Sequence, residues 1–298
     1  MADPKTPLGI VAQVELLLQR GLVASGTDDK LALGRLLADN GFSRLEAYWR
    51  YYQIDPGHGD KTFRPGTTVD AIADLYTFDS TLRRLLAEGL EVFEIALRSR
   101  LAQAMAMAGA LYTYDEQATY RPQMMGPGRS VDARADLLDN IDRDLSRSRE
   151  PFITRYLDQG RIAPLWLAME AFTLGTVSKV YRLLDDQDVR LKVARSFGYP
   201  NERFAENTFH SLSVLRNICA HHARIWHRAD IQYAPPVLKR LQVDADKSVY
   251  QRTPWAWVTI VTHLVDTVRH DTSYSARFLA HVQAHPAYID GLKHPSSI

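Results

Sequence analysis

The chain has 298 residues, of which 46% are hydrophobic and 24% are charged, so it lies outside the disordered, fibrous and disulfide-framework classes. A compact chain of this length buries about three quarters of the surface that its unfolded form exposes, so its core needs neither a metal ion nor a disulfide. The 36 basic and 35 acidic residues leave a net charge of +1. Overall charge therefore gives no attraction to nucleic acid, and any such site has to be a local basic patch.

The chain carries no sequence signal for export or membrane insertion. Its single cysteine, Cys219, has no partner for an internal disulfide, and the first ten residues lack the basic start and apolar run of a secretion signal. The most apolar stretches, residues 101–112 and 255–265, fall short of the ~20 residues that span a bilayer. We therefore expect a cytoplasmic protein without a membrane anchor.

Helical periodicity dominates the chain, and alternating β-branched segments are nearly absent, so the sequence predicts an all-α fold. In chain order, helices are predicted over residues 8–20, 29–40, 69–108, 132–146, 152–159, 164–184, 188–197, 202–226, 237–241, 254–269 and 273–284. The Pro- and Gly-rich residues 55–68 predict an exposed loop that leads into a helix capped near Thr68. Residues 69–108 are expected to form two helices with a soft point near Gly89.

Two acid–base pairs on this long helical stretch, Asp79 with Arg83 and Glu94 with Arg98, have the favourable i,i+4 order of ion pairs on a helix surface. A structural role is sufficient to explain both pairs. Residues 109–130 show no clear period. They predict a boundary between an N-terminal helical lobe, residues 1–120, and a C-terminal helical lobe, residues 121–298, packed as one unit.

The predicted helix over residues 202–226 carries most of the chemistry. On a helical wheel, an apolar stripe is formed by Leu212, Leu215, Cys219 and Trp226, and His222 falls within it. The opposite face continues as a polar ridge with two imidazoles, an amide and two guanidiniums, formed by His210, Asn217, His221, Arg224 and Arg228.

Arg216, Asn217 and His221 have residue types suited to RNA cleavage. An imidazole moves protons near neutral pH, a guanidinium stabilises charge on a phosphoryl group, and an amide holds either in place. Cleavage without a metal ion needs these groups, because the ribose 2′-hydroxyl itself attacks the adjacent phosphate. The spacing alone is a weak pattern.

The segment LRNICAHHARIWHR, residues 215–228, closely resembles the signature of the Abi family of bacterial abortive-infection proteins, the AbiD/AbiF-like group of the HEPN superfamily. Five further stretches fit the same family in the expected order, namely residues 5–22, 42–52, 63–86, 91–101 and 163–181. The resemblance extends from Lys5 to Arg228, and after Arg228 it is loose.

This resemblance implies a HEPN-like helical bundle with an additional N-terminal helical lobe. It also implies a metal-independent endoribonuclease that needs no cofactor and acts as a growth-arresting toxin or phage-defence effector. Arg216 and His221 would form the catalytic pair, with Asn217 beside them. HEPN RNases generally work as homodimers in which an Arg and a His from each protomer meet in a shared cleft. The implied partners are an RNA substrate, a second copy of the chain, and an antitoxin RNA or protein.

The geometry of an ideal helix places Arg216 and His221 about 140° apart. Either two copies of the helix pair, or the helix ends near His221, and the sequence leaves both open. We expect His222 to be structural and His221 functional, although the spacing from Arg216 to His222 also fits the looser HEPN pattern. Phosphate contacts are expected from the ridge residues Arg224, Arg228 and His210.

Several alternatives compete with this interpretation. A metal site drawn from Cys219, His221, His222 and His227 lacks ligand spacing, and a lone Cys on an apolar stripe is usually a core residue. An aromatic cluster is either a base-stacking platform or inter-helix core; it comprises Tyr48, Trp49, Tyr51 and Tyr52, with Arg44 and Arg50. A catalytically silent RNA- or protein-binding module is the alternative to the RNase.

Overall fold

The structure is a computed structural model that describes residues 7–123, 132–229 and 231–296. Within these residues it confirms the all-α prediction. The helices are α1 (Ile10–Gln19), α2 (Thr27–Asn40), α3 (Phe42–Trp49), α4 (Val69–Met107), α5 (Ala133–Arg147), α6 (Pro151–Asp158), α7 (Leu165–Ala171), α8 (Leu174–Leu183), α9 (Gln187–Ser196), α10 (Glu202–Ala220), α11 (Pro254–Arg269), α12 (Ser273–Gln283) and α13 (Asp290–Lys293). Short 3₁₀ turns cover Arg50–Tyr52, Gln117–Thr119, Lys239–Leu241, Lys247–Tyr250 and Pro286–Tyr288, so the helix predicted over 237–241 is reduced to one turn.

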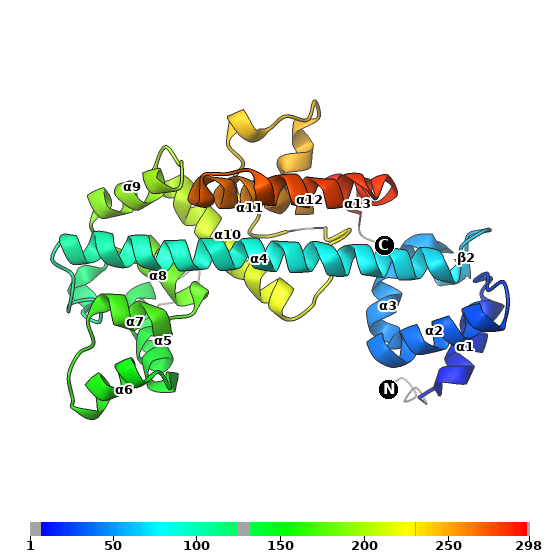
Figure 1. The fold of residues 1–298 in the computed structure, drawn as a ribbon, viewed down its shortest axis with the longest axis horizontal. Helices are drawn as coiled ribbons and strands as arrows, with labels where there is room; N and C mark the ends of the chain where they lie inside the picture. Colours follow the sequence, from blue (N-terminus) through cyan, green and yellow to red (C-terminus); the bar gives the residue numbers. More distant parts are fainter. Residues whose placement is uncertain (1–6, 124–131, 230, 297–298) are drawn as a thin grey trace.

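The long helix α4 is the axis of the molecule (Figure 1). Helices α1 to α3 lie at its N-terminal end, and α5 to α8 gather around its C-terminal end. Helix α11 packs along α4, and α7, α9 and α10 also contact it. Because helices from both the beginning and the end of the chain contact α4, its polar residues are positioned to hold segments that are distant in sequence.

Helix α4 is one continuous helix of 39 residues, which corrects the prediction of two helices with a soft point at Gly89. Gly89 is buried, and a Cβ at this position would overlap the Tyr274 hydroxyl and the Val261 side chain. The Tyr274 hydroxyl donates to the Leu85 carbonyl oxygen at 2.6 Å. The glycine therefore allows α11 and α12 to approach α4 closely, and it does not break the helix.

Two buried clusters share α4. The smaller one combines α1, α2 and α3 with the first turn of α4, and its centre includes Leu17, Leu33, Trp49 and Ile72. The larger one includes α4 residues from Leu75 onward and the helices that follow. The division into lobes near residue 120 stays a prediction, and residues 124–131 of the expected boundary segment lie outside the described residues.

Two further local predictions need correction. The loop expected over 55–68 contains an antiparallel hairpin of β1 (Gln53–Asp55) and β2 (Asp60–Phe63), although Thr68 caps α4 as predicted, accepting from the Ala71 amide at 3.1 Å. The single helix expected over 164–184 is divided into α7 and α8. Asp144 of α5 accepts hydrogen bonds from the Thr173 amide at 2.9 Å and the Thr176 hydroxyl at 2.6 Å, and these contacts hold the break.

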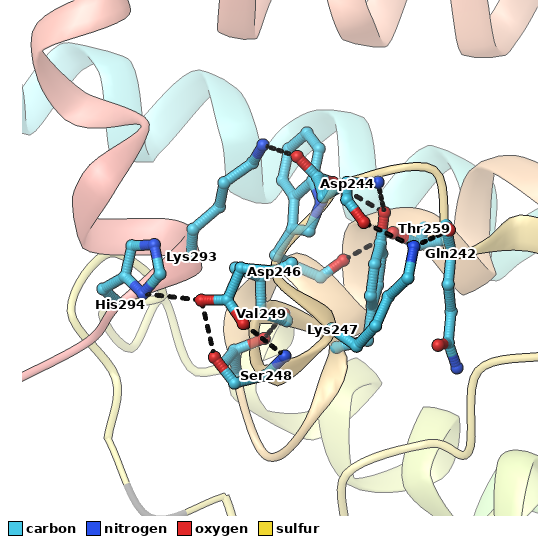
Figure 2. A network of polar contacts seen from close by, with 12 residues as sticks. Gln242, Asp244, Asp246, Lys247, Ser248, Val249, Thr259, Lys293 and His294 are labelled. Atoms are coloured by element: carbon cyan, nitrogen blue, oxygen red, sulfur yellow. Dashed lines mark hydrogen bonds and ion pairs between the residues drawn. The ribbon is translucent and has the colours of Figure 1, made fainter.

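A polar network fixes the C-terminal part of the chain (Figure 2). Lys293 of α13 forms an ion pair with Asp244, whose carboxylate also accepts from the Tyr250 hydroxyl at 2.6 Å. His294 lies 4.0 Å from Asp246. These contacts tie α13 to the segment that precedes α11, and thereby set the path of the residues that follow, up to Ser296.

Candidate functional site

Helix α10 ends at Ala220, six residues before the predicted end. His221 is the C-cap and His222 has a left-handed φ of +53°. The His222 amide donates to the Cys219 carbonyl at 3.0 Å, and the Ala223 amide donates to the Ile218 carbonyl at 3.0 Å. This pair of bonds is a Schellman motif, in which the left-handed position is usually glycine. The predicted end near residue 226 is wrong, because the sequence has a histidine where a glycine usually marks the end, and the alternative that the helix ends near His221 is confirmed.

A buried carboxylate holds the segment after the helix. Asp79 of α4, which has no exposed surface, accepts from the backbone amides of Ile225 at 3.2 Å and Trp226 at 2.8 Å. The Tyr48 hydroxyl donates to the same carboxylate at 2.6 Å, and Arg83 forms an ion pair with it. The expectation of a surface pair is therefore wrong for Asp79 and Arg83. Asp79 binds the backbone 146 positions farther along the chain, and Arg83 is the counter-charge of this buried carboxylate.

Helix α3 holds the same segment from another side. Arg44 Nη1 donates to the His222 carbonyl at 2.6 Å, and Arg224 Nη1 donates to the Ala47 carbonyl. Residues 222–226 are thus held by α3 through the His222 carbonyl and the Arg224 side chain, and by α4 through the backbone amides of Ile225 and Trp226. We call these contacts the clamp and residues 222–226 the clamped segment. The clamp fixes the backbone of His222 and does not involve its imidazole.

Arg216 and His222 line one cavity of about 540 Å³ between α4 and α10. Glu94 and Arg98 of α4 also line it, and the Glu94 carboxylate lies 2.5 Å from Arg98 Nη2 and 3.7 Å from Arg216 Nε. The Arg216 side chain is 46% exposed. A guanidinium and an imidazole are therefore brought to one solvent-accessible cavity, with a carboxylate that orients the guanidinium.

His222 is exposed, so the prediction that it is buried in the apolar stripe is wrong. The left-handed turn removes it from the helical register that the prediction assumed. Asn217 and His221 are also exposed, at the end of α10 beside the cavity, but they do not line it. Of the three predicted catalytic residues, the structure places Arg216 in the cavity and the other two on the adjoining surface.

The predicted polar ridge does not form one face. His210 packs edge-on against Tyr233, and burial, with Arg182 and Lys179 nearby, lowers its pKa. Arg224 and Arg228 lie beyond the helix end, half-buried in a separate cavity beside Tyr51. The ridge is divided because α10 ends before it reaches the two arginines.

The competing sites lack the expected features. Cys219 is buried, and burial raises the pKa of its thiol to about 12, as befits a core residue. Among the described residues, no three His, Cys, Asp or Glu side chains gather as metal ligands would. Tyr48 and Trp49 are buried in the core, which favours the packing interpretation of the aromatic cluster.

Sequence reasoning missed the residues of α3 and α4 that shape this region. Asp79 carried a usable signal, since it falls on the apolar stripe that includes Leu75, Leu82 and Leu86, and a carboxylate in such a stripe needs buried partners. Glu94 and Arg98 were recognised as a pair, but nothing local connects them to Arg216. Arg44 was considered only with the aromatic cluster, and its bond to the His222 carbonyl could not be predicted because a backbone carbonyl leaves no trace in the sequence.

None of the helices in the described parts of the chain combines the length and the apolar character that crossing a membrane requires. No curated protein and no solved structure matches the chain. A family model described as Abi-like protein matches residues 35–227. This range is well over half of the chain and includes α3, α4, α10 and the clamped segment. The chain therefore belongs to the Abi-like protein family.

Proposed function

We propose that this Abi-like protein is a metal-independent endoribonuclease of phage defence, with a HEPN-type site. The observation that carries the proposal is the shared cavity of Arg216 and His222. Family membership supports a role in abortive infection, and the residue types in the cavity support phosphoryl chemistry. If the protein does not cleave RNA in the way described below, the alternative is a catalytically silent RNA- or protein-binding module.

The reaction starts with the substrate's own 2′-hydroxyl. A base removes its proton as the oxygen attacks phosphorus, the bond from phosphorus to the 5′-oxygen breaks, and that oxygen leaves with a proton. The products are a 2′,3′-cyclic phosphate and a free 5′-hydroxyl. Proton transfer suits an imidazole, and the extra negative charge on the phosphorane suits a guanidinium.

Within one chain, the imidazole that shares the cavity with Arg216 belongs to His222. We therefore propose that His222 transfers the proton and that Arg216 stabilises the phosphorane. Glu94 is a positioning residue, since its carboxylate lies 3.7 Å from the Arg216 guanidinium. The exposed Asn217 and His221 would complete a site shared with a second copy of the chain in a homodimer.

The test is cleavage of single-stranded RNA by the purified protein in excess EDTA. Cleavage that yields 2′,3′-cyclic phosphate ends, and that falls about a hundredfold or more in Arg216→Gln, is expected, since one well-placed donor to a developing charge contributes about 3 to 4 kcal/mol. Arg195→Gln is the matched control, because Arg195 is exposed on α9 and does not line the cavity.

Two results would overturn the proposed chemistry. One is activity that disappears with EDTA and returns with Mg²⁺. The other is cleavage of RNA whose 2′-hydroxyl is methylated at the scissile position. Light scattering of the active protein tests the homodimer, and a monomer that retains full activity would remove that step.

A further inference from the structure

A second cavity lies beside the clamped segment, and three arginines are among the residues that line it. It has a volume of about 310 Å³ between α3, the segment after α10 and the end of the described chain. Its charged lining consists of three arginines, Arg50, Arg224 and Arg228, and Ser296 lies at its wall. Among the described residues, no carboxylate lines this cavity. None of the three arginines forms an ion pair with a carboxylate of the described residues.

The positive charge is held in place by the fold. Arg224 donates to the carbonyls of Ala47 and His227, so its guanidinium is fixed against α3. Arg228 Nη1 donates to the Arg224 carbonyl at 3.2 Å. Burial and the neighbouring Arg224 lower the pKa of Arg228, although a guanidinium remains charged at neutral pH. The positive charges of Arg224 and Arg228 therefore repel each other, and a bound anion would reduce this repulsion.

The cavity offers no open aromatic face for a base. The Tyr51 ring is stacked on the His227 imidazole with 4.1 Å between ring centroids, and it also contacts Trp226 edge-on and the Arg224 guanidinium. Its hydroxyl donates to the Ser296 carbonyl at 2.8 Å. A ligand would therefore be recognised by its negative charge, and not by stacking of a base.

The cavity is close to the candidate active site. Arg44 holds the His222 carbonyl and Ala47 lines the cationic cavity, and these two α3 residues are about 4.5 Å apart along the helix axis. Arg228 follows His222 by six positions in the chain, which limits the distance between their Cα atoms to about 20 Å. A strand of a few nucleotides is therefore long enough to span the distance between the two cavities.

We propose that this cationic cavity binds a backbone phosphate of the RNA strand whose scissile bond lies in the Arg216–His222 cavity. The proposal rests on the proposed function for the identity of the polymer. It adds a second, sequence-independent contact that sets the position of the strand, since phosphate contacts fix register without reading bases.

The test measures binding and not cleavage, so that it stands apart from the proposed chemistry. A fluorescent single-stranded RNA with 2′-O-methyl groups throughout is titrated with the protein at several salt concentrations, and anisotropy is recorded. Arg50→Gln and Arg228→Gln are each expected to weaken binding about tenfold at low salt. Each is also expected to reduce the slope of log K against log salt by about 0.7, the value for one phosphate on a single strand. Arg195→Gln, the matched control on α9, should leave the affinity and the slope unchanged.

Ser296→Glu is a second variant that keeps all three arginines. Ser296 is exposed, and its backbone carbonyl and amide make the contacts with the Tyr51 hydroxyl and His227 Nδ1, so the fold should tolerate the change. The new carboxylate should weaken RNA binding about tenfold or more, and Ser296→Gln should not. Wild-type affinity and salt slope in all of these variants would overturn the proposal. It would also be overturned if pyrophosphate bound in an Arg228-dependent way while the RNA did not, since the ligand would then be a free phosphate compound.

Discussion

Helix α4 carries two acid–base pairs of the same spacing that have different roles. Asp79 and Arg83 are buried, and their carboxylate is saturated by two backbone amides and a tyrosine hydroxyl. Glu94 and Arg98 lie in the wall of a solvent-accessible cavity, where the carboxylate also faces Arg216. The i,i+4 spacing therefore does not tell what each acid–base pair does. The role of each pair depends on which distant groups the tertiary fold places next to its carboxylate.

The largest expected effect separates the two pairs by stability. Asp79→Asn leaves Arg83 buried without its counter-charge and weakens the hold on residues 225 and 226, so the free energy of unfolding should fall by about 3 to 5 kcal/mol. Glu94→Gln changes a pair whose Arg98 and Glu94 side chains are 15% and 12% exposed, and it keeps an amide oxygen that can accept from Arg98, so it should cost less, about 1 to 2 kcal/mol. Urea denaturation of both variants measures the contrast. Equal losses would show that the two pairs have the same role.

A smaller effect on activity is expected from the clamp on the His222 carbonyl. Arg44 is exposed and its described contact is this carbonyl, so Arg44→Gln should lower kcat for RNA cleavage about tenfold, equivalent to about 1.4 kcal/mol, with KM and melting temperature nearly unchanged. Arg44→Lys retains a donor and should recover part of the rate. A change confined to KM, or no rescue by lysine, would argue against a positioning role.

A further effect, on stability at acid pH, is expected from His227, which follows the clamped segment. Burial, with Arg224 nearby, lowers the pKa of His227 to about 4. Because the unfolded chain binds the proton near pH 6.5 and the folded chain does not, stability is fully present above pH 6.5 and falls as the pH drops toward 4. His227→Asn tolerates the left-handed φ of +52° and should flatten the melting temperature across this range. A variant that retains the wild-type slope would assign the acid sensitivity to other groups.

Sequence periodicity predicted most of the fold because most helices are amphipathic and have local start and stop signals. The helix over 254–269 begins after Thr253, which caps it, and has proline at its first position, and the structure gives it the predicted bounds. Helix α10 was extended too far because no glycine or proline marks its end. The path of the chain after this end is held by Asp79, which lies in a distant part of the sequence.

The candidate site was predicted only where it lies within the helix. Arg216 was predicted between the two faces of the wheel and is exposed within α10, but the wheel assigned His222, Arg224 and Arg228 to helical positions that they do not occupy. A left-handed residue changes the direction of every side chain after it. The roles of Arg216, Asn217 and His221 in catalysis, and of Arg224, Arg228 and His210 in RNA binding, remain predictions for the assays above.

The most direct test of the account compares His222→Gly with His221→Ala in the EDTA cleavage assay, with melting temperatures measured in parallel. Glycine removes the imidazole and suits the left-handed position, where a side chain costs about 1 to 2 kcal/mol. His222→Gly should therefore melt at or above the wild-type temperature and lose cleavage about a hundredfold or more, while His221→Ala keeps the larger share of the activity. Full activity in His222→Gly together with its loss in His221→Ala would contradict the assignment of His222 and return the proton transfer to His221.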